Sequence, residues 1–289
     1  MADIKPTVTA TKASTHAQPK KSSNAISWIA PVACIILGYV IWRFVFGSPN
    51  NFEKPDLNGW FWPDHHKLKP NTGIAKMYEG GIVVPILIGA FFIVITFVIE
   101  RFLTIQKATG AGNIGEFLRK VQYHLANKDV DKAIAECDKQ KGSVGNVMKS
   151  GLRTYKDMIA DTELSTDQKL LNIQKSIEES TALELPMLEK NLVFLSTLAS
   201  VATLLGLLGT VLGMIKSFSA LGEDSGGSTA AAELSKGISE ALFNTALGIG
   251  TSAVAIIMYN VFTTRIDAIT FGIDESGFTL SQSFASLYK

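Results

Sequence analysis

TLLGLLGTVLGMIKS (residues 203–217) and ALFNTALGIGTSAVA (residues 241–255) are apolar stretches in which small and hydroxyl side chains recur at alternating steps of three and four. This spacing places each set on one face of a helix. The other faces carry Leu, Val, Ile, Phe and Met, which suit lipid or a neighbouring helix. The sets are Ser196, Ala199, Thr203, Gly206, Thr210, Gly213 and Ser217, and Ala241, Thr245, Gly248, Ser252 and Ala255.

Two interpretations of these faces remain open. In a bilayer, small residues let helix backbones approach closely, so the faces can simply be packing surfaces. The packing candidates are Gly206, Gly209, Gly213 and Gly248. Two such helices joined by a short polar segment also favour a shared polar pathway, and this is the interpretation we adopt. Its candidate lining residues are Thr203, Thr210, Ser217, Thr245 and Ser252, with Glu240 at the outer end.

Thr210 and Thr245 lie at matching depths on the two predicted helices. Counting residues from the helix ends places each about 10–12 Å below the outer surface. A threonine hydroxyl can donate and accept a hydrogen bond, so the pair can join a water wire. The alternative is that each hydroxyl bonds to a carbonyl one turn earlier in its own helix, which carries no function.

Neither face contains an Asp, Glu, His or Lys in mid-membrane. Glu240 stands at the margin, where it can be buried for a reason or can complement a helix dipole, and Asn244 one turn below can pair with it or cross-link helices. Proton transfer through a membrane needs a titratable group. If the chain conducts protons, another polypeptide must therefore bring the carboxylate; a close-packed scaffold without transport is the alternative.

The composition supports a membrane protein and offers no catalytic motif. The 289 residues are 47% hydrophobic and 18% charged, and the net charge of +1 gives no basic footprint for nucleic acid. Cys34 lies in an apolar block and Cys137 in a charged block, and the two are too distant in the sequence to indicate a metal site or a disulfide framework. We interpret His65 and His66 as a solvated pair in a loop. We expect no metal, no cofactor and no enzymatic activity.

The predicted fold is all-α, an integral membrane protein with about four transmembrane helices whose long helices extend into an α-helical cytoplasmic domain. A cleaved signal peptide is the alternative interpretation of the first apolar segment, but no small-residue cleavage site follows this segment. The domain and the third span can also form one continuous helix. The segments are a disordered tail 1–25, an extra span 26–46, an external loop 47–79, a span 80–100, a helical cytoplasmic domain 101–191, a span 192–220, an external loop 221–236, a span 237–262 and a cytoplasmic tail 263–289.

Loop charges predict the orientation. Lys and Arg gather on the N-terminal arm and beside the inner ends of the spans, whereas 223–233 holds no basic residue. The positive-inside rule then places both termini and the 101–191 domain in the cytoplasm. The aromatic run Trp60-Phe61-Trp62 suits a membrane interface on the opposite side.

Two motifs carry a family resemblance. GLLGTVLGMIKSF (residues 206–218) is similar to the second-helix signature of the ExbB/TolQ/MotA proton-channel family. GISEALFNTALGI (residues 237–249), followed by Tyr259-Asn260, is similar to its third-helix signature, and 125–152 resembles its cytoplasmic stretch. The resemblance covers about residues 80–265, and within the family it is strongest to ExbB.

The resemblance implies a homo-oligomer, a pentamer around a central pore, in the bacterial inner membrane, with phospholipid outside it and periplasmic external loops. A single-span ExbD-like subunit carrying an intramembrane Asp and a TonB-like protein are its implied partners; nucleic acid is not. The family's pore threonines fall on Thr210 and Thr245 and its pore-end glutamate on Glu240.

Three departures from the family pattern keep alternatives open. The family usually has Pro where this chain has Thr203 and Val254, which puts helix kinks in doubt. The span 26–46 is additional and makes the helix count resemble MotA. A TolQ/MotA-like stator for envelope maintenance or gliding motility, and a non-conducting scaffold, therefore remain beside the ExbB-like motor. The transported cargo and the choice of proton or sodium are not readable from the sequence.

Overall fold

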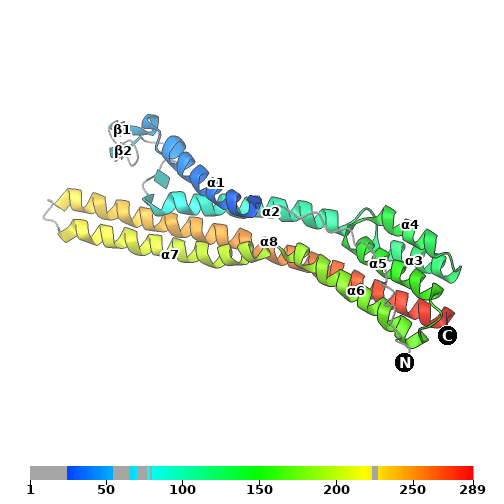
Figure 1. The fold of residues 1–289 in the computed structure, drawn as a ribbon. Helices are drawn as coiled ribbons and strands as arrows, with labels where there is room; N and C mark the ends of the chain where they lie inside the picture. The colour runs from blue at the N-terminus through cyan, green and yellow to red at the C-terminus, as the bar shows by residue number, and fades with distance from the viewer. Residues whose placement is uncertain (1–24, 55–65, 70–76, 79, 223–226, 289) are drawn as a thin grey trace, which may run out of the picture.

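The computed structural model describes residues 25–54, 66–69, 77–78, 80–222 and 227–288 as an elongated helical bundle (Figure 1). The predicted tail before Ala25, Trp60-Phe61-Trp62 and His65 lie outside these residues. The elements are α1 (Ala25–Ile41), a π-helical turn (Trp42–Phe46), a 3-10 turn (Pro49–Asn51), β1 (Phe52–Lys54), β2 (His66–Leu68), α2 (Val83–Thr109), α3 (Ile114–Ala126), α4 (Val130–Gln140), α5 (Gly142–Ala160), α6 (Thr166–Glu189), α7 (Leu192–Gly222) and α8 (Gly227–Leu287).

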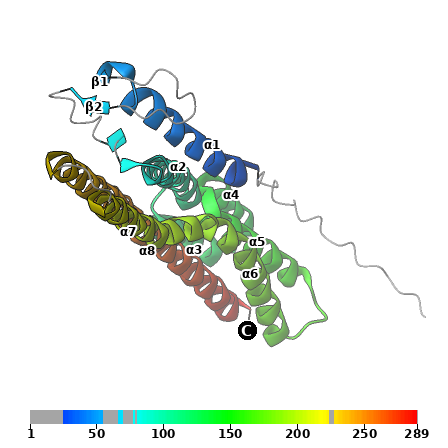
Figure 2. The ribbon, with the colours of Figure 1, turned by 90° about the vertical axis from the view of Figure 1, so that its left-hand side faces the viewer.

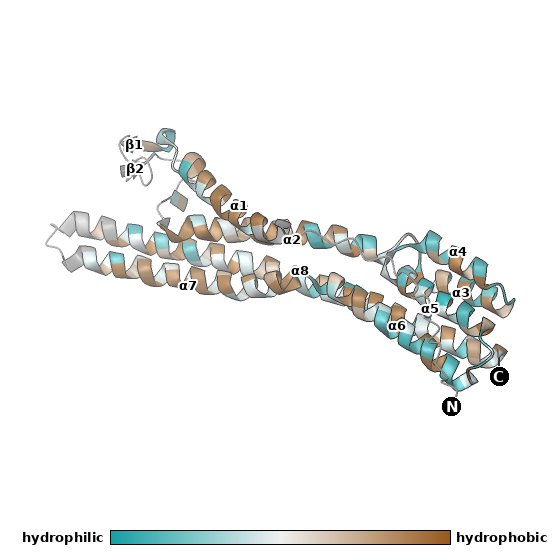
Figure 3. Ribbon diagram, in the orientation of Figure 1, coloured by the Kyte–Doolittle hydropathy of each residue, from teal (hydrophilic) through white to brown (hydrophobic). Residues whose placement is uncertain are grey.

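Among the residues that the structure describes, four helical stretches are long and apolar enough to cross a membrane. They lie within Ile29–Phe46, Val83–Ala126, Thr166–Ser219 and Leu234–Leu287. Figure 3 shows the apolar residues concentrated on α1, α2 and the paired parts of α7 and α8, while polar residues gather on α3 to α6. The chain is thus a multi-pass, all-α membrane protein, as predicted. A small antiparallel ribbon, in which Phe52 pairs with Leu68 and Lys54 with His66, lies in the segment 47–79 that was predicted as an external loop, and the ribbon itself was not predicted.

The helix α8 runs unbroken for 61 residues, which corresponds to about 90 Å. It therefore extends far beyond a bilayer core of about 30 Å. The residues after Thr263, predicted as a tail, are its helical continuation. Apolar side chains keep a helical spacing there and are buried against the soluble helices: Phe262, Ile266, Ile269, Ile273, Leu280 and Phe284.

The helices α3, α5 and α6 pack against this distal half of α8, and α4 packs against α3 and α5 (Figures 1 and 2). Their starts carry side-chain caps: Asn113 accepts from Gly115 N, Asp129 accepts from Lys132 N, and Ser165 forms a reciprocal capping box with Gln168. One core of buried apolar residues continues from α2 through this domain to the end of α8. The predicted cytoplasmic domain and the spans are thus built on shared helices.

The first helix, α1, crosses α2 at two glycines. A Cβ placed on Gly38 would lie 2.6 Å from the backbone nitrogen of Gly89, so no larger residue fits without separating the helices. Cys34 and Thr96 are also within 3.5 Å across this contact, and Trp42 stacks on Tyr78 with ring centroids 4.4 Å apart. The outward face of α1 and of the π-helical turn after it is apolar and exposed, as a lipid-facing helix requires: Ile29, Val32, Ile36 and Val40 on α1 and Phe44 in the turn.

The thiol of Cys137 provides a test of the soluble core. It is buried at 2% exposure, and desolvation raises its pKa to about 12. Because the folded state favours the neutral thiol, burial of Cys137 contributes fully to the free energy of unfolding below the unfolded pKa of about 8.5. This stabilisation is lost as the pH rises toward the folded pKa of about 12. In a Cys34→Ala background, we expect iodoacetamide to label the folded protein slowly and the denatured protein rapidly. Equally rapid labelling of both would contradict the buried position.

Candidate functional site

The helices α7 and α8 lie antiparallel and in contact along the predicted membrane region (Figure 1). At their tightest crossing, a Cβ on Gly248 would lie 2.6 Å from Ala202 O and 2.8 Å from Gly206 Cα. A Cβ on Gly213 would lie 3.0 Å from Gly237 O, and Gly209 lies against the side chain of Asn244. The glycines of the two small-residue faces are therefore placed at the contact between the helices, where backbone meets backbone.

Four of the five predicted hydroxyls, those of Thr203, Thr210, Ser217 and Thr245, donate to a carbonyl of their own helix. Thr210 Oγ1 donates to Leu207 O at 2.5 Å, and Thr203 Oγ1 donates to Ala199 O at 3.3 Å. Ser217 Oγ, which is buried, donates to Gly213 O at 2.8 Å. Thr245 Oγ1 lies 3.2 Å from Ala241 O and 3.4 Å from Gly206 O, so it also reaches α7. The oxygens of these hydroxyls keep their acceptor capacity, since each uses only its proton here.

Two open grooves flank the helix pair. One, of about 650 Å³, is lined by Thr210, Val211, Met214, Ile215, Phe218 and Ser219 on α7. The other, of about 480 Å³, is lined by Ser196, Ala199, Ser200, Thr203, Leu204, Ser252, Ile256 and Tyr259, so it gathers hydroxyls from both helices. Among these described lining residues none is charged. The arrangement offers uncharged, mostly apolar surfaces that carry a few hydroxyl groups beside a tightly packed helix pair.

The structure therefore separates residues that the sequence placed together. Thr203 and Ser252 meet in the second groove, whereas Thr210 lines the first groove on α7 alone. Thr245 lies over Gly206, whose added Cβ would be 3.4 Å from Thr245 Cα. The helical period identified both faces, but each face is wide enough to serve packing on one side and a groove on the other.

Glu240 occupies the outer end of α8 and is 8% exposed. Lys216 Nζ of α7 lies 3.5 Å from Glu240 Oε2. The Lys216 side chain is 62% exposed, so it pairs with the carboxylate from the surface. Glu240 also lies against Gly81, ahead of α2, and is therefore directed toward a third helix. Sequence analysis did not single out Lys216, although a lysine within a predicted span is an unusual residue.

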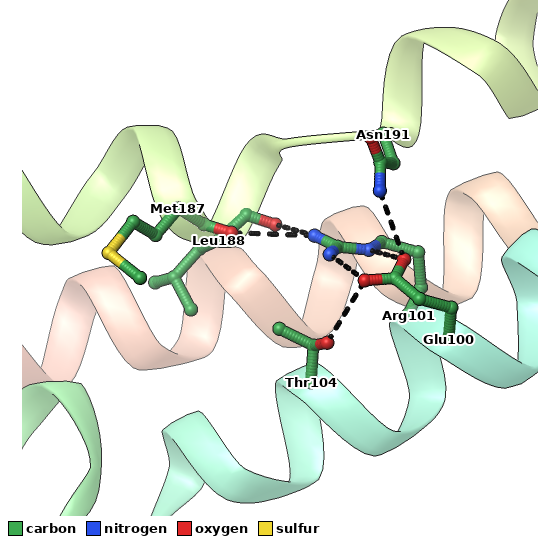
Figure 4. A network of polar contacts seen from close by, with 6 residues as sticks. All are labelled: Glu100, Arg101, Thr104, Met187, Leu188 and Asn191. Atoms are coloured by element: carbon green, nitrogen blue, oxygen red, sulfur yellow. Dashed lines mark hydrogen bonds and ion pairs between the residues drawn. The ribbon is translucent and has the colours of Figure 1, made fainter. Parts of the chain in front are cut away.

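A polar network lies where α2, α6 and α7 meet (Figure 4). Arg101 is 2% exposed and donates from Nη1 to Leu188 O at 3.2 Å and to Met187 O at 3.4 Å. Its Nε and Nη2 donate to the two carboxylate oxygens of Glu100 at 2.6 and 2.5 Å. Asn191 Nδ2 donates to the same carboxylate at 3.2 Å. Arg101 thereby supplies donors to carbonyls at the end of α6, which have lost their helical partners.

This network marks a break that the sequence left open. The predicted domain and third span do not form one helix: Lys190 leaves the helical conformation with ψ 138°, and Asn191 has φ +67°. Asparagine tolerates this left-handed conformation better than most residues. The sequence signal was available in Arg101, since a buried arginine at the margin of a span needs partners, but those partners are backbone carbonyls that no sequence pattern reveals.

Two glycines two residues apart on α8 provide a matched test of the packing. Gly248→Ala should force α7 and α8 apart, because its Cβ meets backbone that cannot rotate away. We expect a loss of about 1–3 kcal/mol in detergent unfolding. Gly250→Ala should cost nothing, because a Cβ there meets no atom within 4 Å. Equal stability of the two variants would reject the tight crossing.

Removal of the Arg101 guanidinium should loosen the joint between α6 and α7. Arg101→Leu removes the side-chain donor of two carbonyls and leaves the Glu100 carboxylate with only Asn191 and Thr104 as donors, so we expect a loss of about 2 kcal/mol. The figure is below that for a fully buried pair because the Glu100 side chain is 33% exposed. Arg119→Leu, an exposed arginine on α3, is the control. The hydrogen-exchange rates of the amides near 187–194 should rise only in Arg101→Leu. Unchanged rates would contradict the role of Arg101 in holding the end of α6 in place.

Comparison with known proteins accounts for this helix pair. Residues 139–275, just under half of the chain, match the MotA/TolQ/ExbB proton channel family. The chain is 38% identical over 87 residues to biopolymer transport protein ExbB-like 3 of Synechocystis sp., which covers 30% of this chain and 41% of that protein. It is 40% identical over 87 residues to the Tol-Pal system protein TolQ of Haemophilus influenzae, covering 30% and 37%. It is 34% identical over 73 residues to biopolymer transport protein ExbB of Salmonella typhimurium, covering 25% and 29%.

These matches span less than half of each relative's length. The family match contains α5 to α7 and α8 as far as Glu275, hence every candidate residue from Thr203 to Ser252, whereas α1 and α2 lie outside it. The motifs GLLGTVLGMIKSF and GISEALFNTALGI, the antiparallel α7–α8 pair and this match agree. Through residues 139–275, the chain is similar to the MotA/TolQ/ExbB proton channel family.

Proposed function

We propose that this chain is an ExbB-like subunit of an inner-membrane, proton-driven motor that couples the proton motive force to TonB-dependent outer-membrane transport. The observation that carries the proposal is the uncharged surface beside α7 and α8, in which hydroxyl groups interrupt apolar side chains, in a region similar to this family. Such a surface can surround a proton pathway but lacks a titratable carrier of its own. A partner must supply the carboxylate, and a single-span ExbD-like subunit with an intramembrane Asp fits this need. The role is non-enzymatic.

The proposed assembly is a ring of identical subunits, a pentamer by family resemblance, that encloses the partner helices. The exposed faces of α7 and α8 are apolar, with Leu204, Leu207, Val211, Ile215 and Ile249 among their residues. These side chains suit lipid, including phospholipid between subunits, or a neighbouring helix. Both termini and the helical domain 101–191 would lie in the cytoplasm.

A second candidate is a TolQ-like role in envelope maintenance. It rests on the match to the Haemophilus influenzae TolQ, which is 40% identical over a stretch as long as that shared with the ExbB-like protein. The two roles use the same helix pair and differ in the partner that receives the movement. The additional helix α1 leaves a MotA-like motility stator as a further variant of this function.

The proposed pathway is tested by the double variant Thr210→Val and Thr245→Val. Valine keeps the shape of threonine and removes the hydroxyl, so assembly should persist while a water wire is interrupted. We expect a loss of proton-motive-force-dependent uptake, or of outer-membrane integrity if the TolQ-like role holds, of at least tenfold, about 1.4 kcal/mol. Thr264→Val is the matched control, because Thr264 is exposed on α8 and bonds only within its helix at 2.9 Å.

Native mass spectrometry provides the control for assembly. The wild type, the Thr210/Thr245 double variant and Thr264→Val should give a homo-oligomer of the same mass, the mass of a ring, at equal cellular levels. Wild-type activity in the double variant would reject the pathway and leave the small-residue faces as packing surfaces. A functional wild-type monomer would reject the ring.

A further inference from the structure

A second apolar cluster lies at the outer end of the bundle, apart from the long core around α8. Its buried members come from the π-helical turn after α1, from β1, and from α2 and the segment before it: Trp42, Phe52, Tyr78, Val84 and Ile88. Leu247 of α8 also packs against this cluster. In both views of the ribbon, α2 lies between α1 and the α7–α8 pair (Figures 1 and 2). The cluster therefore connects the extra span with α8 across α2.

Tyr78 is held by the segment that follows α1. The Trp42 ring stacks on the Tyr78 ring with centroids 4.4 Å apart and planes at 13°, and the Phe52 ring meets it in a T-shaped arrangement with centroids 5.5 Å apart. Gly47 adds a backbone contact, since a Cβ there would lie 2.4 Å from Tyr78 Cε2. Trp42 is 1% exposed and Tyr78 is 7% exposed, so these rings are packed inside the protein and do not form an aromatic belt at a membrane interface.

The backbone after Tyr78 is held from the other side by α8. Gly80 follows Tyr78 by two positions, so the Cα atoms of the two residues are at most about 7 Å apart. The Gly80 carbonyl accepts a hydrogen bond from Asn244 Nδ2 at 3.1 Å, and Asn244 is 1% exposed. The next residue, Gly81, has φ +70°. Two consecutive glycines give this segment wide conformational freedom, so contacts on both sides are needed to hold Gly80 in place.

We propose that α1 is an intramolecular brace: through the stack of Trp42 on Tyr78, its outer end holds Gly80 against Asn244 and fixes the distance between the outer ends of α2 and α8. Among the helices, α1 packs mainly on α2, and both lie outside residues 139–275, the region similar to the channel family. The brace is therefore a device added beside the α7–α8 pair, and it acts on α8 through α2. It rests on packing and geometry alone and does not depend on the proposed function.

Pulsed electron paramagnetic resonance on the full chain in nanodiscs measures the distance that the brace fixes. Cys34 and Cys137 are replaced by Ala, and nitroxide labels are attached to cysteines introduced at Ile82 and Leu242, which are 60% and 64% exposed. Labelled chains are diluted with unlabelled chains, so that only distances within one chain are recorded. The chain without further changes should give one narrow distance distribution, because the outer ends of α2 and α8 are held together.

Trp42→Leu keeps a buried apolar side chain but removes the ring from the stack. We expect the distance distribution between 82 and 242 to broaden and to shift to longer distances. Tyr78→Leu removes the other ring and should have the same effect, so the test does not rest on the folding of one variant. Trp42→Phe keeps a ring that can stack and should keep the distribution narrow. Phe44→Leu is the matched control, because Phe44 lies in the same turn as Trp42 but is 67% exposed, and it should leave the distribution unchanged.

A second pair of labels, at the exposed residues Leu103 of α2 and Ala268 of α8, reports on the same helices toward their inner ends. Its distribution should remain narrow in all variants, because the brace acts at the outer end. An unchanged distribution between 82 and 242 in both Trp42→Leu and Tyr78→Leu would overturn the proposal. Equal broadening of both pairs, or broadening in Phe44→Leu, would also overturn it, because the loss would then be general. No readout depends on uptake, so a failure of the proposed function would leave this inference intact.

Discussion

The backbone contact between α7 and α8 is the constraint on which the rest of the molecule depends. Gly206 and Gly248 bring the two helices so close that a single added methyl group meets main-chain atoms. Lipid cannot supply a hydrophobic driving force between membrane helices, so this close fit replaces it. The same contact decides which side chains lie outside the helix–helix interface. Because the glycines face inward, Thr203, Thr210 and Ser252 lie at the grooves beside the pair.

The helix α2 packs beside the α7–α8 pair and makes polar contacts with its neighbours near each of its two ends. At its outer end, Gly80 and Gly81 receive Asn244 and Glu240 of α8. At its inner end, Arg101 reaches the final carbonyls of α6. Between these two points α2 contacts its neighbours mainly through apolar side chains such as Val94 and Phe97. Polar groups thus set the register of α2, and apolar burial holds it in place.

Much of the fold could be predicted from hydropathy and helical spacing, because both act within one element. The four spans, the helical domain and the two small-residue faces follow from such local patterns. The break at Lys190–Asn191 and the helical continuation beyond Thr263 could not be predicted, since they depend on Arg101 and on burial against α3, α5 and α6. The same limit applies to the site. Spacing identified Thr210 and Thr245 as one set, but only the rotation of each helix about its axis decides which groove a hydroxyl reaches.

The contrast between the unbroken α8 and the jointed α6–α7 pair has a mechanical consequence. A helix of 61 residues with a continuous hydrogen-bond ladder joins the small-residue face of α8 directly to its C-terminal half, so a rotation of one part carries the other with it. Between α6 and α7 the ladder is interrupted at Lys190 and Asn191, and Arg101 binds the last carbonyls of α6. A movement imposed on the α7–α8 pair would therefore reach the C-terminal half of α8 along one helix. It would reach α6 only across the non-helical joint and through the packing of α6 on α8.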